Sequence, residues 1–341
     1  MDNKQEIFGK LVLLRARGIG PVKYNNLISQ FGSVAAAVDA LNPATEHTDS
    51  VRREMDAAAR LGIVYISDCD PRYPQNLREI KNHPPVMTVR GNIAALSRPM
   101  IAMVGTRHAS GAGIKFFANV AHDLAAGGAV IVSGMAMGSD TAAHNGALAS
   151  GSDAATIAVL AGGADYIWPL ENERLYHYIC ERGAIVSERP VGFTPTATNF
   201  IQRNRWIAGL SDKLILGEAD DGSGSAATAG FAHGYGRPVF AVPGHPADDR
   251  AAVPNRMIAN GTAVLFSGAD DLLPKRQKTV KKNIDENNSG GPVLDALSGI
   301  PISESVLSEM LDRNVSDIKA DLILMELSGH AQKCDGGWVR A

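Results

Sequence analysis

The sequence predicts a doubly wound α/β domain over residues 100–273, flanked by a helical domain and a small C-terminal domain. Two observations indicate the central fold. Short apolar runs without in-and-out alternation follow one another here, and amphipathic helical patterns separate them, as expected for parallel strands buried on both faces. Glycine is frequent, with 35 residues in 341, which favours tight turns between such elements. At roughly 100–200 residues per domain, this length predicts two or three domains.

The first domain, residues 1–62, is predicted to be helical. Apolar side chains recur at helical spacing over residues 5–16 and again over residues 24–31, and Gly18-Ile19-Gly20-Pro21 joins the two patterns. Helix, short glycine-containing hairpin and helix form a helix-hairpin-helix pattern, whose backbone amides can meet a DNA phosphate. A plain turn between two helices explains the glycines equally well.

Residues 63–99 are expected to be an extended connector that leads into the start of the core. Prolines recur through it, at Pro71, Pro74, Pro84, Pro85 and Pro99. Each restricts the residue before it to extended backbone, so a helix is not expected here.

The elements of residues 100–273 follow in order from the pattern. The expected strands are the apolar runs at 100–105, 129–134, 155–163, 184–188, 213–219, 238–244 and 263–266. The expected helices cover 112–126, 139–149, 171–182, 225–235 and 253–260, with a further one starting near residue 200. Ligands of such sheets bind beyond the carboxyl ends of the strands.

The chain then changes character twice. Residues 274–291 are polar and charge-rich without periodicity, which predicts a linker. Residues 292–341 show three short helical patterns and a glycine-containing hairpin, which predict a winged-helix-like module. Such modules bind DNA or protein. Because Lys319 is the single basic residue of its segment 314–320, a protein-interaction or vestigial module is favoured over a DNA-binding one.

Composition excludes several classes of protein. Lys plus Arg is 33 and Asp plus Glu is 36, so the net charge is −3, and any nucleic-acid site must be a local basic patch. The cysteines Cys69, Cys180 and Cys334 lie far apart without metal-ligand spacing. We therefore expect no metal ion and no disulfide, and a reducing cytoplasm as the location. No apolar run is long enough for a membrane span, so no membrane contact is expected.

A strand end, glycines, a helix start and an arginine converge at residues 105–113. Gly105 and Arg107 follow the first central strand, and Ser110 opens the next helix. Free amides at a helix start attract an anion, and a guanidinium adds a two-pronged contact, so we expect a phosphate here. The glycine spacing does not match a dinucleotide fingerprint, so no dinucleotide or other cofactor is expected. A turn glycine with a surface arginine is the alternative.

The next two strand ends carry further small-residue turns, at Gly134 and Gly162. Asp140 and His144 lie four residues apart on one predicted helix face, a spacing that could serve a metal or an acid–base pair. Without a third ligand nearby, a capping or hydrogen-bonding pair is favoured. Trp168 could stack on a base or fill a gap beneath its loop.

The densest basic cluster of the α/β domain consists of Phe200, Arg203, Asn204 and Arg205. Arginine suits phosphates, and an adjacent aromatic ring offers a stacking face. Apolar residues follow at helical spacing, so this helix packs and holds its arginines in place.

Ser223 and Gly224 open a further helix as another small-residue anion cradle. At least five strand ends therefore carry glycine or serine turns. A long, amide-lined rim with Arg107, Arg203 and Arg205 fits a polyanion better than a small metabolite.

These motifs resemble the DNA-processing protein A family (DprA, also called Smf) over residues 60–273. The matching motifs, in chain order, are Tyr73-Pro74, Pro84-Pro85, Gly91-Asn92, Gly105-x-Arg107, Ser133-Gly134-x-Ala136-x-Gly138-x-Asp140, Phe200-x-x-Arg203-Asn204-Arg205, Ser223-Gly224 and Ala241-Val242-Pro243-Gly244. The N-terminal helices resemble the family's sterile-alpha-motif-like domain, and the C-terminal module resembles its winged-helix extension.

The resemblance implies a Rossmann-like, mostly parallel domain that binds single-stranded DNA and helps to load the recombinase RecA, in recombination and in the natural transformation of competent cells. It also implies a homodimer formed through this domain, and a protein that is not an enzyme. By position, Arg107 would grip a DNA phosphate, with Phe200 shaping the groove. The remaining residues of the predicted DNA-binding set are Gly105, Ser110, Gly134, Gly162, Arg203, Asn204, Arg205, Ser223 and Gly224.

A nucleotide-processing enzyme is the alternative. The predicted fold also resembles that of cytokinin-activating phosphoribohydrolases, which bind a nucleotide phosphate at a glycine-rich turn. The equivalent turn here is 223–228, and Glu218 would be the candidate acid.

Overall fold

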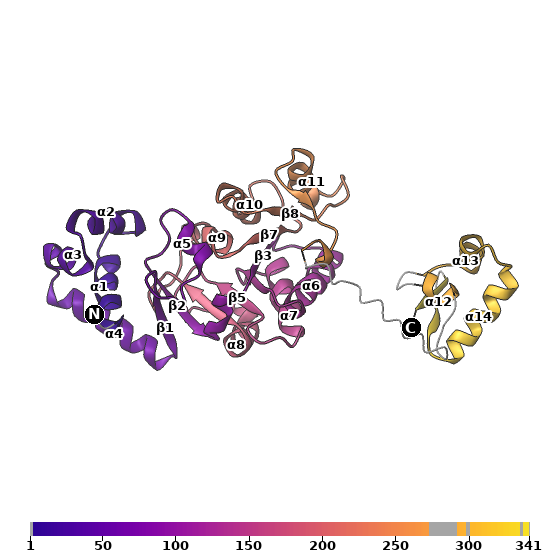
Figure 1. The fold of residues 1–341 in the computed structure, drawn as a ribbon, viewed down its shortest axis with the longest axis horizontal. Coiled ribbons are helices and arrows are strands. Elements are labelled where there is room, and N and C mark those ends of the chain that lie inside the picture. Colours follow the sequence, from indigo (N-terminus) through magenta and orange to yellow (C-terminus); the bar gives the residue numbers. More distant parts are fainter. Residues whose placement is uncertain (1–2, 273–291, 298–300, 335–336, 341) are drawn as a thin grey trace. The chain divides into compact units, whose positions relative to one another are not determined.

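The computed structural model describes residues 3–272, 292–297, 301–334 and 337–340, and the chain divides into two compact units after Lys275 (Figure 1). The predicted linker, 274–291, lies outside the described residues. Among the helices that the structure describes, none combines the length and the apolar character needed to cross a bilayer.

Four helices open the chain, as the prediction of a helical domain requires. They are α1 (Asn3–Arg15), α2 (Pro21–Phe31), α3 (Val34–Leu41) and α4 (Thr45–Arg60). The expected hairpin joins α1 to α2, and Gly18 takes the left-handed backbone conformation there, with φ of 76°. Leu13, Tyr24 and Ala37 form a small core between the helices.

Residues 63–99, expected to be an extended connector, instead contribute two strands to the sheet. The segment holds β1 (Ile63–Ser67), a short α5 (Gln75–Glu79), β2 (Val86–Gly91) and the 3-10 turn η1 (Ile93–Ser97). β1 and β2 pair in antiparallel fashion, from Ile63 opposite Arg90 to Ser67 opposite Val86. The prolines do not prevent this because they precede α5, β2 and β3 and lie within none of the strands.

The sheet has nine strands in the order β1-β2-β6-β5-β4-β3-β7-β8-β9, and the pairs from β6 to β9 are parallel. The seven strands expected from apolar runs are all present: β3 (Met100–Val104), β4 (Val130–Ser133), β5 (Thr156–Val159), β6 (Ala184–Ser187), β7 (Lys213–Leu216), β8 (Val239–Ala241) and β9 (Val264–Leu265). The prediction of a doubly wound, mostly parallel α/β domain is therefore confirmed.

Helices cover both faces of the sheet. They are α6 (Gly111–Ala126), α7 (Ser139–Ala149), α8 (Glu173–Arg182), α9 (Ala197–Leu210), α10 (Gly224–Gly234) and α11 (Ala252–Ala259), with 3-10 turns η2 (Leu170–Asn172), η3 (Asp249–Ala251) and η4 (Ala269–Asp271). In β3, Met100 and Val104 join the cluster that contains α9, whereas Met103 joins the cluster of α6 and α7. Alternate side chains of one strand therefore pack into two separate cores, one on each face of the sheet.

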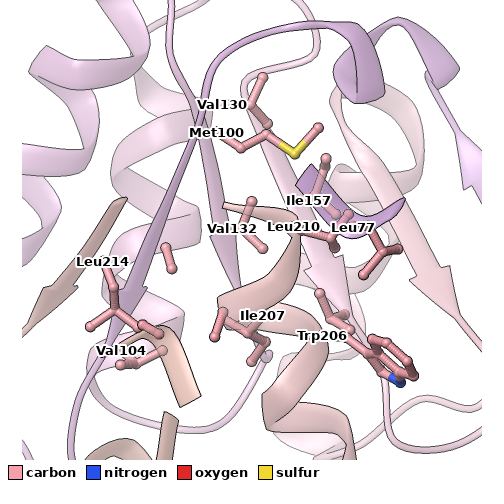
Figure 2. Close-up of a cluster of buried hydrophobic side chains, with 14 of the residues drawn as sticks. Leu77, Met100, Val104, Val130, Val132, Ile157, Trp206, Ile207, Leu210 and Leu214 are labelled. Atoms are coloured by element: carbon pink, nitrogen blue, oxygen red, sulfur yellow. The ribbon is translucent and has the colours of Figure 1, made fainter. Parts of the chain in front are cut away.

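The α9 face of the sheet is packed with aliphatic side chains. Figure 2 shows Trp206, Ile207 and Leu210 of α9 beside Val104 and Val132 of the strands. This packing fixes the helix that carries the Phe200–Arg205 cluster.

The C-terminal unit has its own core. It comprises α12 (Pro292–Ala296), α13 (Glu304–Leu311), α14 (Val315–Leu327) and the antiparallel hairpin β10 (Ala331–Cys334) and β11 (Gly337–Arg340). Leu307, Ile318, Leu322 and Trp338 are buried together. Three helices and a hairpin agree with the predicted elements, and the winged-helix interpretation stays a prediction.

The strand order indicates where a ligand site is expected on the sheet. The chain moves from β3 outward through β4, β5 and β6, then returns to the other side of β3 as β7. The carboxyl ends of β3 and β7 thus flank the point where the winding reverses, where ligands of open α/β sheets bind.

Candidate nucleic-acid interface

A groove of about 670 Å³ opens at this reversal point. Four segments line it: the loop after β3, the start of α7, the first half of α9 and the start of α10. Trp168, from the loop before η2, closes one side. The groove therefore lies where the sequence predicted a binding rim, but it is more local than a rim along five strand ends.

An exposed arginine and two aromatic rings form one wall of the groove. The Arg107 guanidinium carbon lies 5.1 Å from the centre of the Trp168 ring, and that ring lies 4.4 Å from the centre of the Phe200 ring. Both rings are half-buried, while Arg107 is exposed. The two ring planes are tilted by 59°. A cation held beside a pair of aromatic rings suits a ligand that carries both phosphates and bases.

Arg203 is buried beneath the groove, with 6% of its surface exposed, so it cannot lie on an open rim. Its guanidinium donates to the carbonyl oxygen of Gly134 at 2.6 Å and to that of Val159. The pKa of Arg203 is lowered to about 10, mainly by burial; the charge of Asp140 opposes this shift, and that of Arg107 adds to it. Arg203 therefore ties the ends of β4 and β5 together and forms the floor of the groove.

Asn204 and Arg205 have separate positions. Asn204 lines the groove and donates from Nδ2 to the carbonyl oxygen of Gly224 at 3.1 Å, which joins α9 to α10. Arg205 lies outside the groove, with its guanidinium carbon 3.9 Å from the centre of the Trp206 ring and Nη2 3.5 Å from a carboxylate oxygen of Glu188. The expectation of three arginines along one rim is therefore wrong, because successive residues of a helix point in different directions.

The N-terminus of α6, expected to cradle a phosphate at Ser110, is occupied by a carboxylate of the protein itself. Glu218 accepts from the Ser110 N–H at 2.7 Å and from its hydroxyl at 2.5 Å. A carboxylate is favourable at a helix N-terminus because of the aligned peptide dipoles. These contacts engage both carboxylate oxygens of Glu218. Glu218 lines a neighbouring cavity and does not line the groove. It therefore does not face the groove as the catalytic acid that the alternative function requires.

The N-terminus of α10 does open on the groove. Ser223 caps this helix by accepting from the Ala226 N–H at 3.3 Å, and Ser223 and Gly224 both line the groove. Of the two helix starts predicted as anion cradles, α10 is the one that faces the ligand space.

The remaining predicted glycines serve close packing. A Cβ on Gly105 would stand 2.7 Å from the Cβ of Ser139, so glycine lets the loop after β3 approach α7. Gly134 meets the Arg203 guanidinium in the same way, with a Cβ position 2.6 Å from its central carbon. Gly162 is buried, and its carbonyl accepts from the Ser187 hydroxyl at 2.6 Å. Gly134 and Gly162 therefore support the groove from behind.

Asp140 and His144 lie under the same floor with different partners. One Asp140 oxygen accepts from the N–H groups of Gly134 and Ala136, both at 3.2 Å. Burial raises the pKa of Asp140 and lowers that of His144 to about 3, and His144 Nδ1 lies 2.7 Å from the Thr156 hydroxyl. These contacts agree with the hydrogen-bonding interpretation favoured from the sequence.

His108 is a groove residue that the sequence analysis missed. It is exposed, lines the groove and follows Arg107 directly. Its place in the same strand-end loop was the signal that could have identified it.

Comparison with known proteins identifies a family whose sequence model matches this chain. The model of the DNA recombination-mediator protein A family matches residues 64–277, and that of a DprA-like N-terminal HHH domain matches residues 4–60. Protein Smf of Synechocystis is 37% identical over 226 residues, which span 63% of this chain and 56% of that protein.

Two solved structures are similar. DNA processing protein A from Streptococcus pneumoniae has a TM-score of 0.64 and 32% identity, covering 80% of this chain and 97% of that one. The Helicobacter pylori protein, whose structure is described for its single-stranded DNA binding mode, has a TM-score of 0.57 and 28% identity, covering 63% of this chain and 95% of that one.

Proposed function

This chain belongs to the DNA recombination-mediator protein A family, and we propose that it binds single-stranded DNA as a mediator of recombination. The observation that carries the proposal is the exposed Arg107 guanidinium over the Trp168 and Phe200 rings, at the point where the sheet reverses its winding. The single-stranded DNA binding named for the Helicobacter pylori relative supports the same ligand.

Each part of the groove has a role in this proposal. Arg107 and the open start of α10 meet phosphates, and the exposed face of the aromatic pair stacks on a base. Since every base has a flat π-face, binding is tolerant of sequence. Arg203 holds the floor in place and contributes positive potential from below.

The Arg107→Ala substitution tests the groove. We expect the affinity for oligothymidylate to fall about tenfold, because one charge-assisted contact contributes about 1.5 kcal/mol or more. The slope of log affinity against log salt concentration should fall in magnitude by about 0.7, because the variant makes one phosphate contact fewer and releases correspondingly fewer counterions. Fluorescence anisotropy over a salt series measures both.

Arg182→Ala is the matched control, because Arg182 is an exposed arginine of α8 outside the groove. If Arg107→Ala binds as tightly as Arg182→Ala and with the same salt slope, the groove is not the binding site.

We propose further that the bound strand is handed to RecA and leaves chemically unchanged, as expected for a member of a recombination-mediator family. The engaged carboxylate of Glu218 and the burial of Asp140 and His144 support a binding role over a catalytic one. In the cytoplasm, the protein would speed nucleation of RecA on single strands. A RecA nucleation assay, with gel analysis of the recovered DNA, tests both points: no acceleration, or cleaved DNA, would overturn them.

We also propose a homodimer formed through the α/β domain. The edge strand β9 exposes Val264 at 57% and Leu265 at 50%, and an apolar sheet edge left open to water favours pairing with another chain. Leu265→Lys should shift the mass measured by light scattering from dimer to monomer, and an unshifted mass would place the interface elsewhere.

A further inference from the structure

A second cleft lies on the other side of Ile201 from the groove. It has a volume of about 560 Å³ and lies between the α1–α2 hairpin and the α/β domain, so we call it the hairpin cleft. Ile201 of α9 lines both the groove and the hairpin cleft, and 58% of its surface is exposed. The two cavities therefore meet at one exposed side chain.

The hairpin cleft carries an excess of positive charge. Three arginines line it, Arg15, Arg189 and Arg205, together with one acidic residue, Glu188. Arg15 is already paired with Glu54, with Nη2 2.8 Å from Oε1, so the excess comes from Arg189 and Arg205. Arg189 and Arg205 each lie 3.5 Å from the Glu188 carboxylate, so one negative charge is shared between two guanidinium groups. The walls are therefore suited to an anion.

The hairpin cleft also repeats the chemistry of the groove. The Arg189 guanidinium carbon lies 5.3 Å from the centre of the Phe193 ring, as Arg107 lies over Trp168. Arg189 is held in place by donating to Gln202 Oε1 at 2.6 Å. A cation beside an aromatic face, twice in adjoining cavities, fits a ligand in which phosphates and bases repeat.

The hairpin itself borders the cleft at the start of α2. Ile19, Gly20 and Pro21 line the cleft, and α2 begins at Pro21 without a side-chain cap and without an acidic residue in its first turn. Lys23 lies in that turn and is exposed. A cation at a helix N-terminus is unfavourable by itself, and an anion bound there would offset the repulsion.

The cleft walls are held together by the protein core. Leu11 and Val12 of α1 pack in one cluster with Val86 and Ile185 of the sheet. Lys10, nearly fully buried, donates to Asp68 Oδ1 at 2.5 Å across the same junction. The helical domain therefore presents its hairpin in a fixed position beside the groove.

We propose that a single DNA strand bound in the groove crosses Ile201 and continues into the hairpin cleft, where Arg189 and the hairpin meet its next phosphates. This inference rests on the proposed function. It assigns the N-terminal hairpin a role in DNA contact and makes the total site longer than the groove alone.

Binding of oligothymidylates of increasing length tests the path. For the full chain, affinity should rise in two steps, the second when the strand is long enough to enter the hairpin cleft. Arg189→Ala and Lys23→Ala should each remove several-fold of affinity from long strands and leave the shortest strands unaffected. Arg107→Ala should weaken binding at every length, and Arg182→Ala is the control for loss of one exposed arginine.

The outcomes separate the two proposals. If Arg189→Ala and Lys23→Ala bind long strands like the unmodified chain, the path is wrong while the groove stands. If they weaken long strands but Arg107→Ala does not, the groove proposal fails, and the continuous path fails with it.

Photocrosslinking tests the path by showing which residues each position of the bound strand contacts. A strand with 5-iododeoxyuridine at successive positions should crosslink to Trp168 or Phe200 from one position and to Phe193 from another. Crosslinks confined to Trp168 and Phe200 would overturn the path through the hairpin cleft.

Discussion

Three arginines of the predicted site show that residue type alone does not set a role. Arg107 is exposed over an aromatic ring, Arg203 is buried among carbonyl groups, and Arg205 is paired with Glu188 in the hairpin cleft. The buried arginine stabilises the floor because its donors satisfy carbonyl oxygens that would otherwise lack partners. In the proposed function, the exposed guanidinium of Arg107 donates to a phosphate of the strand.

His144 makes stability depend on pH. Its pKa is lowered to about 3 by burial, whereas an unfolded histidine has a pKa of about 6.5. Between these values the unfolded chain binds a proton that the folded chain excludes, so the free energy of unfolding falls as pH falls. The His144 contribution is fully present above about pH 6.5, and from about pH 7 to about pH 5 it should lose about 2 kcal/mol. Urea unfolding at both pH values measures it.

His144→Gln is the comparison variant, because an amide can still bond to the Thr156 hydroxyl and does not titrate. The variant should lose less stability between the two pH values than the unmodified chain. Equal losses would show that His144 is not the group responsible.

At the scale of elements, α9 presents side chains to three different surroundings, because residues of a helix point in different directions. Phe200 and Asn204, four residues apart, line the groove, while Ile201 and Arg205, also four apart, line the hairpin cleft. Trp206 is buried on the sheet side. One helix therefore couples the core to both proposed binding surfaces, which follows from i and i+4 residues sharing a face.

Packing of α7 on α6 depends on Gly146. A Cβ there would overlap the backbone of Ala118, whereas a Cβ on Gly230 of α10 would meet open space. We expect Gly146→Ala to lower the free energy of unfolding by about 1–3 kcal/mol through overpacking. Gly230→Ala should raise it by about 0.5–1 kcal/mol, because alanine favours a helix interior. Thermal unfolding of both variants checks the opposite signs, and equal signs would contradict the close contact of α6 and α7.

At the scale of the molecule, two units each hold their own core. Leu307, Ile318 and Trp338 cluster within the C-terminal unit, while the sheet and the four N-terminal helices share the cores of the first. The net charge of −3 belongs to the whole chain and does not prevent a local excess of arginine. The proposed nucleic-acid contact would therefore depend on the local geometry of the first unit and not on bulk charge.

A chain that ends at Lys275 should fold and bind single-stranded DNA with the affinity of the full chain. The reason is that the groove, the hairpin cleft and their supporting cores all lie before residue 273. Thermal unfolding and fluorescence anisotropy of the shortened chain measure the two properties. A large loss of affinity, with the unfolding midpoint unchanged, would show that the C-terminal unit takes part in DNA contact.

The sequence alone predicted the strands β3 to β9 and most of the helices between them, because strands buried on both faces of a parallel sheet require apolar runs. It also named Arg107, Phe200, Ser223 and Gly224 as candidate residues, and the structure brings all four to the groove. Their contact with DNA stays a prediction.

Only the tertiary structure showed that β1 and β2 join the sheet, that Glu218 fills the start of α6 and that Arg203 points inward. These facts depend on partners that are far away along the chain: Ile63 lies opposite Arg90, Ser110 beside Glu218 and Arg203 beside Gly134. Local periodicity carries no information about such partners, since the direction of a side chain is decided by what packs against it.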